Sequence, residues 1–152
     1  MLIRAMTKED LDEVLAVERE SFCEPWTKNM FLGELSQEIT VYRVAAEDDR
    51  IIGYMGMYHV ADEGHITNVA VAKDFRRCGV AGALIASFLA YAQENRLAFL
   101  TLEVRRSNSG AIRLYEKYGF REIGVRPRYY ENKEDALLMT RFLRQGENEH
   151  GK

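Results

Sequence analysis

Hydrophobic and polar residues recur along the first quarter of the chain with periods that predict one strand and two helices. Residues 2–5 form the expected strand. After the predicted N-cap Thr7, apolar residues follow at helical spacing at Leu11, Val14, Leu15 and Phe22. Pro25 ends this helix, and Thr27 caps a second, short helix with an apolar face of Phe31, Leu32 and Leu35.

The middle of the chain predicts three strands and one long helix. Strand-like runs cover residues 41–47, 51–60 and 65–72. Gly53 and Gly56 lie inside the second run, where glycine indicates a bulge or the close approach of another group. The helix begins near Val80 and ends at Asn95, and its apolar stripe consists of Ala81, Leu84, Ile85, Phe88, Leu89 and Ala92.

The last third of the chain adds one helix and three strands. Residues 98–104 alternate between the two faces of a strand. A helix begins at Asn108 or Ser109 and ends at Gly119, which suits a left-handed C-terminal cap. The last two strands are residues 120–125 and 136–143. This order of elements predicts an α/β fold, a mixed sheet of six to seven strands with helices on both faces.

The composition is that of an ordinary globular domain. The 152 residues are 47% hydrophobic and 30% charged, and we assign residues 1–145 to a single domain and residues 146–152 to a polar, frayed tail. A net charge of −3 predicts no general attraction to nucleic acid or to an anionic membrane. Two cysteines, no apolar run of membrane-spanning length and no signal-peptide pattern predict a cytoplasmic protein.

A basic, glycine-containing turn joins the third middle strand to the long helix. Its residues are Arg76, Arg77, Cys78, Gly79, Val80, Ala81 and Gly82. The first N–H groups of a helix have no partner within the helix and favour an anion, and glycine lets the backbone approach a phosphate. The turn therefore predicts a site for a ligand with a pyrophosphate; the alternative is an ordinary turn with exposed arginines.

The spacing argues against two common phosphate loops. A Walker loop requires Gly-Lys-Ser or Gly-Lys-Thr, which the chain lacks. A dinucleotide fingerprint requires three spaced glycines in a first βαβ unit, whereas Gly79 and Gly82 lie in mid-chain with Ala81 between them. The pattern Arg76-x-x-Gly79-x-Ala81 instead resembles the acetyl-CoA pyrophosphate loop of the GNAT family of N-acetyltransferases.

A longer stretch resembles the same family and, more narrowly, its RimI branch. It runs through Leu102-Glu103-Val104-Arg105, Asn108, Ala111-Ile112 and Leu114-Tyr115-Glu116. Further matches are Phe22-x-x-Pro25-Trp26, Arg128-Tyr129-Tyr130 and Glu134-Asp135-Ala136, so the resemblance covers roughly residues 2–143. It implies the GNAT fold, acetyl-CoA as co-substrate without a metal, and acetylation of the N-terminal alanine of ribosomal protein S18.

Glu103 and Tyr115 match the family's proton acceptor and proton donor. An amine loses a proton when it attacks a thioester, and we expect Glu103 to be partly desolvated, which would raise its pKa toward that of a useful base. The alternative is an idle carboxylate in solvent. The Tyr115 phenol is expected to protonate the CoA thiolate; its alternative is core packing, the role that we assign to Tyr118.

The resemblance assigns cofactor contacts to three places. The backbone of Val69, Ala70 and Val71 is implied to pair with the pantetheine arm and to polarise the thioester carbonyl. Residues 76–82 are implied to hold the pyrophosphate; Cys78 departs from the longer polar residues common there, although only its backbone matters. Asn108 is expected both to cap its helix and to contact the cofactor.

The candidates for acceptor binding are Pro25, Trp26, Tyr129 and Tyr130. The alternatives are a core role for Trp26 and an exposed loop for the tyrosines. An α-amine, with a pKa of about 7.7–8.0, suits a modest base better than lysine, with a pKa of about 10.4. His65 is expected to be a strand residue, and no metal site is predicted, because His59, His65 and His150 lack partners at ligand spacing.

Three other functions are weighed against this one. In the first, the enzyme is the same but its acceptor is a polyamine, an antibiotic or protein lysines; the aromatic loop argues against the small acceptors. A non-catalytic acyl-CoA-binding module would need neither Glu103 nor Tyr115. An RNA-binding patch of Arg126, Arg128, Tyr129 and Tyr130 is opposed by the negative net charge. Direct transfer is expected, because neither cysteine lies beside a histidine in a nucleophile pattern.

Overall fold

Seven strands form one mixed sheet in the computed structural model, which describes residues 1–143 of the chain. The strand order is β1-β2-β3-β4-β5-β7-β6, and every neighbouring pair is antiparallel except β4 and β5. The strands are β1 (Leu2–Ala5), β2 (Thr40–Glu47), β3 (Arg50–Val60), β4 (Glu63–Val71), β5 (Phe99–Arg105), β6 (Arg121–Arg126) and β7 (Ala136–Phe142). The predicted mixed sheet is confirmed, and the predicted tail lies outside the described residues.

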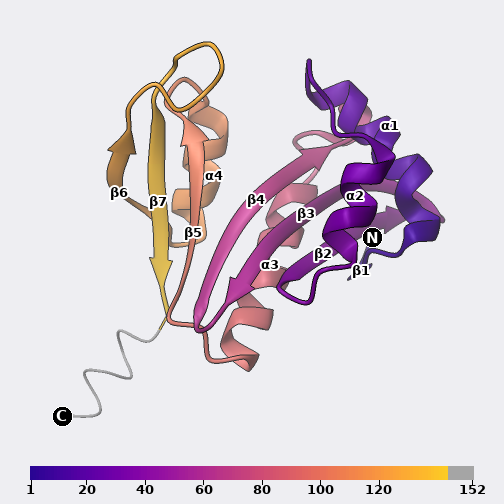
Figure 1. Cartoon of the computed structure of the whole chain (residues 1–152), viewed down its shortest axis with the longest axis horizontal. Coiled ribbons are helices and arrows are strands. Elements are labelled where there is room, and N and C mark those ends of the chain that lie inside the picture. The colour runs from indigo at the N-terminus through magenta and orange to yellow at the C-terminus, as the bar shows by residue number, and fades with distance from the viewer. Residues whose placement is uncertain (144–152) are drawn as a thin grey trace.

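Helices cover both faces of this sheet, as predicted. They are α1 (Leu11–Ser21), α2 (Lys28–Leu35), α3 (Val80–Glu94) and α4 (Ser109–Lys117), with short 3-10 turns at Lys8–Asp10 and Lys73–Phe75. Figure 1 shows α1 and α2 in front of the half formed by β1 to β4, and α3 behind it. Behind β5 and β7 lies α4, so the front face of β5, β7 and β6 carries no helix within residues 1–143.

One prediction about the first helix is wrong. Phe22 was expected on its apolar face, because it lies seven residues after Leu15. The helix instead ends at Ser21, and Phe22 has the extended dihedral angles φ −134° and ψ 142° with 44% of its surface exposed. The chain leaves the helix one residue too early for Phe22 to reach the core.

Both glycines of β3 mark the irregularities that the sequence predicted. The pairing of β2 with β3 shifts register beside Gly53, and the pairing of β3 with β4 shifts between Gly56 and Met57. A Cβ atom added to Gly56 would lie 2.3 Å from the ring of Tyr42. Only glycine therefore lets Tyr42 lie flat on β3 where β4 bulges.

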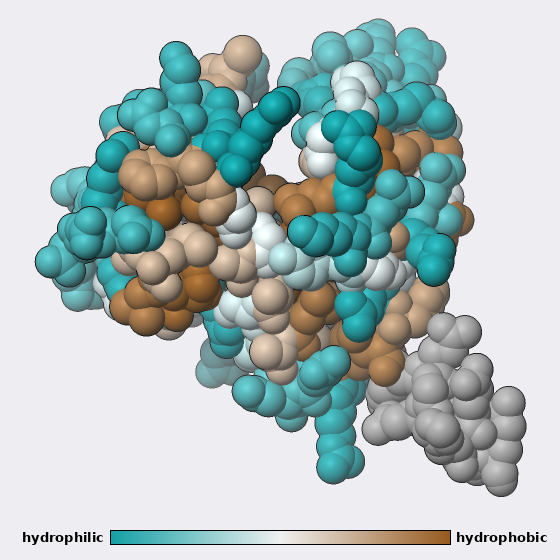
Figure 2. Space-filling model, turned by 180° about the vertical axis from the view of Figure 1, so that it is seen from behind, coloured by the Kyte–Doolittle hydropathy of each residue, from teal (hydrophilic) through white to brown (hydrophobic). Residues whose placement is uncertain are grey.

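The two halves of the sheet separate where β4 and β5 stop pairing. Their parallel pairing begins at Glu63 with Phe99 and ends at Ile66 with Leu102. Beyond Ile66, β4 continues to Val71 beside β3 alone, so its backbone has no strand partner on the β5 side within the described chain. Figure 1 shows the two strands diverging, and the space-filling view is indented at its upper edge between two lobes (Figure 2). This notch between β4 and β5 organises the candidate site.

Candidate active site

Glu103 lies on β5 where the notch begins, and its carboxylate is held from two sides. His65 Nε2, from β4, lies 2.7 Å from Glu103 Oε1, and Arg126 Nε, from β6, lies 2.9 Å from Glu103 Oε2. Only 7% of the Glu103 side chain is exposed, against 39% for His65 and 53% for Arg126. A buried carboxylate is thus linked to solvent through two partly exposed side chains.

The expected upward pKa shift of Glu103 is wrong. Burial does raise the pKa of this carboxyl group, but the hydrogen bond from His65 and the nearby charge of Arg126 outweigh burial, so its pKa lies below the ordinary value. Desolvation was foreseen from the apolar strand; the two partners were not, because they lie 38 and 23 residues away along the chain. Glu103 is therefore ionised at neutral pH.

His65 and Arg126 are the residues that sequence reasoning missed as members of the site. One signal was available for His65, since parallel pairing places it opposite Thr101, on the sheet face that also carries Glu103. Arg126 ends β6, and β7 separates it from β5, so its approach to Glu103 depended on the order of the last strands. Strand order across a crossover is not encoded in a local pattern.

Tyr115 lies on α4 with its ring in the core and its hydroxyl available. The residue is 6% exposed and packs against Phe120 at a ring distance of 5.8 Å. Among residues 1–143 its hydroxyl has no hydrogen-bond partner, yet it is not one of the fully enclosed polar atoms. Burial, with a smaller contribution from Tyr130, raises the pKa of Tyr115 to about 12. The phenol is thus both core packing and a free, protonated donor.

The predicted phosphate turn lies between the end of β4 and the first turn of α3. Gly79 is the N-cap of α3 with a φ of +82°, and Arg77 before it also has a positive φ of +63°. These angles turn the chain sharply enough to present the first N–H groups of the helix to solvent. The backbone geometry expected for an anion site is present, and Cys78 within it is an exposed free thiol.

The guanidinium of Arg76 is directed at protein groups. Its Nε donates to the carbonyl of Val71 at 3.2 Å, and Nη2 lies 3.4 Å from the carbonyl of Glu20 at the end of α1. Arg76 therefore ties the turn to β4 and α1. The neighbouring Arg77 is exposed and makes no ion pair in the described chain, so it is the arginine available to a phosphate.

Gly82 in the first turn of α3 is required by Tyr118, which packs against it. A Cβ atom at Gly82 would lie 2.7 Å from the Tyr118 hydroxyl and 3.3 Å from the nearest ring carbons. This supports the packing role predicted for Tyr118. It also explains why the helix that begins at the phosphate turn has a buried glycine here.

Gly82→Ala is expected to destabilise the protein by about 1–3 kcal/mol and to weaken acetyl-CoA binding, because the overlap moves the start of α3. Denaturant unfolding and calorimetric titration would measure both. Since the closest overlap is with the Tyr118 hydroxyl, adding Tyr118→Phe should restore most of the lost stability. Gly110→Ala is the matched control, because nothing lies within 4 Å of its added Cβ. Equal stability of Gly82→Ala and the parent would contradict the packing.

The remaining predicted cofactor residues lie at the end of β4 and at the start of α4. Val69, Ala70 and Val71 form the end of β4, whose outer edge has no strand partner in the described chain, although the Val71 carbonyl accepts from Arg76; the side chain of Ala70 is buried. Asn108 caps α4, where its Oδ1 accepts from the backbone N–H of Ala111 at 3.2 Å. The capping role of Asn108 is therefore confirmed. The unpaired strand edge is the feature to which an extended ligand adds like another strand.

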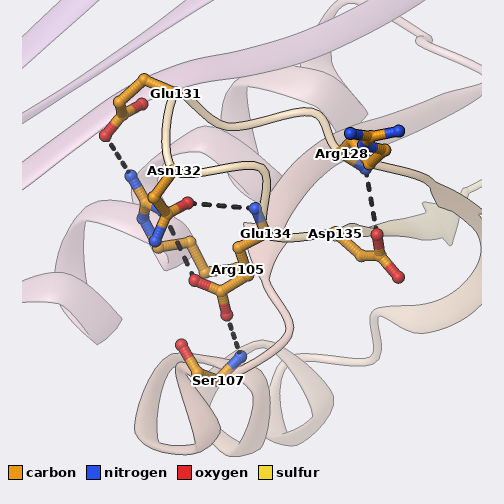
Figure 3. A network of polar contacts seen from close by, with 7 residues as sticks. All are labelled: Arg105, Ser107, Arg128, Glu131, Asn132, Glu134 and Asp135. Carbon is orange, nitrogen blue, oxygen red and sulfur yellow. Dashed lines mark hydrogen bonds and ion pairs between the residues drawn. The ribbon is translucent and has the colours of Figure 1, made fainter.

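The loop with Tyr129 and Tyr130 is fixed by a polar network around Arg105 (Figure 3). Arg105 donates to Glu131 at 2.7 Å and to Asn132 at 3.0 Å. The carboxylate of Glu134, which also faces Arg105, accepts from the backbone N–H of Ser107 at 2.7 Å. The network joins the loop to the end of β5 and the start of α4, so the loop is held beside the notch.

The two tyrosines differ in their exposure. Tyr129 is 51% exposed, whereas Tyr130 is half-buried with the Arg105 guanidinium 4.0 Å from its ring centroid. Burial raises the pKa of Tyr130 to about 12, and the charge of Glu103 contributes to that shift. Tyr130 also contributes to the raised pKa of Tyr115, so it interacts electrostatically with both the predicted proton acceptor and the predicted donor.

Trp26 and Pro25, the other acceptor candidates, lie in the connection between α1 and α2. Trp26 is partly buried, with its ring 5.2 Å from that of Phe31. Its backbone N–H donates to the buried carboxylate of Glu18 at 2.9 Å, so the connection is anchored to α1. The predicted alternative of a core role for Trp26 is therefore confirmed; its contact with an acceptor stays a prediction.

Within residues 1–143, no group of three His, Cys, Asp or Glu side chains is placed to hold a metal ion. None of the helices described is both long and apolar enough to cross a membrane.

Comparisons with known proteins agree with the family that the sequence motifs indicated. Residues 7–120 match the model of the acetyltransferase (GNAT) family. A putative ribosomal protein bS18-alanine N-acetyltransferase of Bacillus subtilis is 39% identical over 139 residues, 90% of this chain and 92% of that protein. An N-alpha-acetyltransferase of Sulfurisphaera tokodaii is 32% identical over 91% of this chain and 90% of its own.

A solved structure agrees with the fold. The crystal structure of the ribosomal-protein-S18-alanine N-acetyltransferase from Escherichia coli superposes with a TM-score of 0.86 at 29% identity, covering 93% of this chain and 92% of that one. The seven-stranded sheet, the turn at α3 and the sequence match over most of the chain lead to one conclusion. This chain is a member of the GNAT family of acetyltransferases.

Proposed function

We propose that this protein transfers the acetyl group of acetyl-CoA to the N-terminal α-amine of a protein, with the N-terminal alanine of ribosomal protein S18 as the leading acceptor. One observation carries the proposal. The ionised Glu103, which His65 of β4 contacts where the β4–β5 pairing ends, and the protonated Tyr115 hydroxyl, which has no hydrogen-bond partner in the described chain, both interact electrostatically with Tyr130. Binding of acyl-CoA alone requires neither group.

The chemistry follows from these positions. The neutral amine attacks the thioester carbonyl carbon, and the carbon–sulfur bond breaks as the amide forms. The amine's proton passes to Glu103, and His65 offers it a path onward to solvent. Tyr115 protonates the departing thiolate of CoA, and an N–H in Val69–Val71 polarises the carbonyl. Acetyl amide and CoA thiol are the products, with no covalent enzyme intermediate.

The cofactor is proposed to lie along the notch. The pantetheine arm adds to the outer edge of β4, and the pyrophosphate lies on the backbone of residues 76–82 with Arg77 as its exposed cation. Asn108, at the start of α4, contacts the cofactor as well as capping its helix. We further propose that residues 1–145 form this single catalytic domain, and that no metal takes part. A cytoplasmic location stays a prediction.

The preference for an α-amine rests on the base and on the relatives. A carboxylate with a lowered pKa cannot deprotonate lysine efficiently near neutral pH, whereas an α-amine is already partly neutral there. The relatives from Bacillus subtilis and Escherichia coli are both named as N-acetyltransferases that act on an alanine of the S18 protein. A lysine, polyamine or other small amine is the second candidate, because the site is partly open where Tyr129 is exposed.

Mass spectrometry tests this function directly. A short peptide beginning Ala-Arg is incubated with the protein and acetyl-CoA, beside a peptide with a blocked N-terminus and one free lysine. We expect one added acetyl group on the free N-terminus alone. Acetylation of the lysine peptide instead would move the acceptor to side chains. Transfer to neither peptide would overturn the proposal and favour a small acceptor or a binding module.

A further inference from the structure

A trough of about 380 Å³ runs along the helix-free front face of the second half of the sheet. One end is formed by Glu103 and its partners His65 and Arg126. The other end is formed by Phe99 and Phe142, whose ring centroids are 6.0 Å apart. The trough therefore begins at the proposed proton acceptor and leads away from the notch.

The walls of this trough are apolar, and its floor offers few free polar groups. Ile123 and Phe142 are each 53% exposed, although both are large apolar side chains. On the floor, the hydroxyls of Thr101 and Thr140 lie 2.8 Å apart and bind each other. Exposed apolar side chains gathered around a hollow mark a binding surface rather than a solvent-facing one. The trough suits an apolar side chain.

We propose that the trough binds the fourth or fifth residue of the acceptor polypeptide and selects an apolar side chain there, which rests on the proposed function. The trough is continuous with Glu103, and its length matches that of a short extended peptide. Glu103 and Phe99 are four residues apart on β5, a distance of about 13 Å at the rise of a strand. An extended acceptor has a similar rise, so a chain with its α-amine at Glu103 places residue four or five over Phe99 and Phe142.

Peptides and a surface variant test the trough. Two hexapeptide amides beginning Ala-Arg-Ser would carry Phe or Ser at residues four and five, and kcat/KM for α-acetylation would be measured. Phenylalanine is expected to raise kcat/KM about tenfold, since it buries part of an aromatic ring. Phe142→Ser should remove that gain, while leaving acetylation of the tripeptide amide Ala-Arg-Ser unchanged. Leu2→Ser, at a similarly exposed apolar residue on the far edge of the sheet, should change neither.

Three results would overturn the inference, and they differ from one another. Equal kcat/KM for the two hexapeptides, with the tripeptide still acetylated, would show that the trough selects no acceptor side chain, while the proposed function would stand. A change in sedimentation of Phe142→Ser without a change in peptide selectivity makes this face a contact between two copies of the chain. No α-acetylation of any peptide removes the proposed function, and this inference with it.

Discussion

Glu103→Gln is expected to lower kcat for α-acetylation of an Ala-Arg peptide by about 10²–10³ at pH 7, while Kd for acetyl-CoA changes by less than about twofold. The amide has the size of the carboxyl group and can still accept the hydrogen bond from His65, but it cannot take up the amine's proton. Steady-state kinetics of CoA release and calorimetric titration of acetyl-CoA would measure the two effects separately.

The fold should tolerate this change, because Arg126 and His65 both reach solvent when Glu103 loses its charge. Thermal unfolding of the variant would verify that it is folded. Glu122→Gln is the matched control, since Glu122 is an exposed carboxylate on β6, which β7 separates from β5. Equal turnover of Glu103→Gln and the parent would remove this residue from the mechanism.

The pKa shift of Glu103 fixes the sign of the pH dependence. Its folded-state pKa is lowered, so the carboxylate stays ionised as pH falls through the ordinary value for glutamate, and protonation of Glu103 begins only below it. Loss of kcat/KM between pH 8 and pH 6 is therefore expected to follow protonation of the acceptor amine, whose pKa is about 7.7–8.0. With an acceptor whose amine is less basic, this loss of kcat/KM should shift to lower pH by the difference between the two amine pKa values.

The sequence predicted the elements well because their signals are local. Thr27 caps α2 through its hydroxyl, Asn95 caps the end of α3, and Gly119 has the positive φ that its position required. Each signal acts within one turn of its own helix. The prediction for Phe22 was wrong because the spacing of apolar residues does not show at which residue the chain leaves the helix.

The electrostatics of the site could not be predicted in the same way. The face of β5 that carries Glu103 followed from simple alternation, and its burial followed from its place at the end of an apolar strand. The sign of its pKa shift depended on His65, which arrives through the parallel pairing of β4 and β5, and on Arg126, which arrives across β7. Burial and ion pairing shift a carboxyl pKa in opposite directions, so a correct prediction of burial gave the wrong sign.

Arg76 illustrates a further limit. A basic residue beside a glycine turn predicts a phosphate contact, yet its guanidinium binds the carbonyls of Val71 and Glu20. These acceptors come from β4 and from the end of α1. The sequence shows that a cationic side chain is present, but only the fold decides whether it already binds other groups of the protein.

Tyr115→Phe is expected to lower kcat by about 10² with a change in folding stability of less than about 1 kcal/mol. The ring keeps its packing against Phe120, and the hydroxyl that is lost has no protein partner in the described chain. A general acid that is needed only as the thiolate departs should affect turnover and leave acetyl-CoA binding nearly unchanged. A thiol-reactive dye would follow CoA release, and denaturant unfolding would measure stability.

Tyr118→Phe is the matched control for this prediction, because Tyr118 ends the same helix but packs against Gly82. It should release CoA at the parental rate. Since burial raises the pKa of Tyr115 to about 12, the parent should show no decline in kcat from this residue up to about pH 10. An unchanged rate of CoA release in Tyr115→Phe would leave Tyr115 as a packing residue, and another group or water would have to protonate the thiolate.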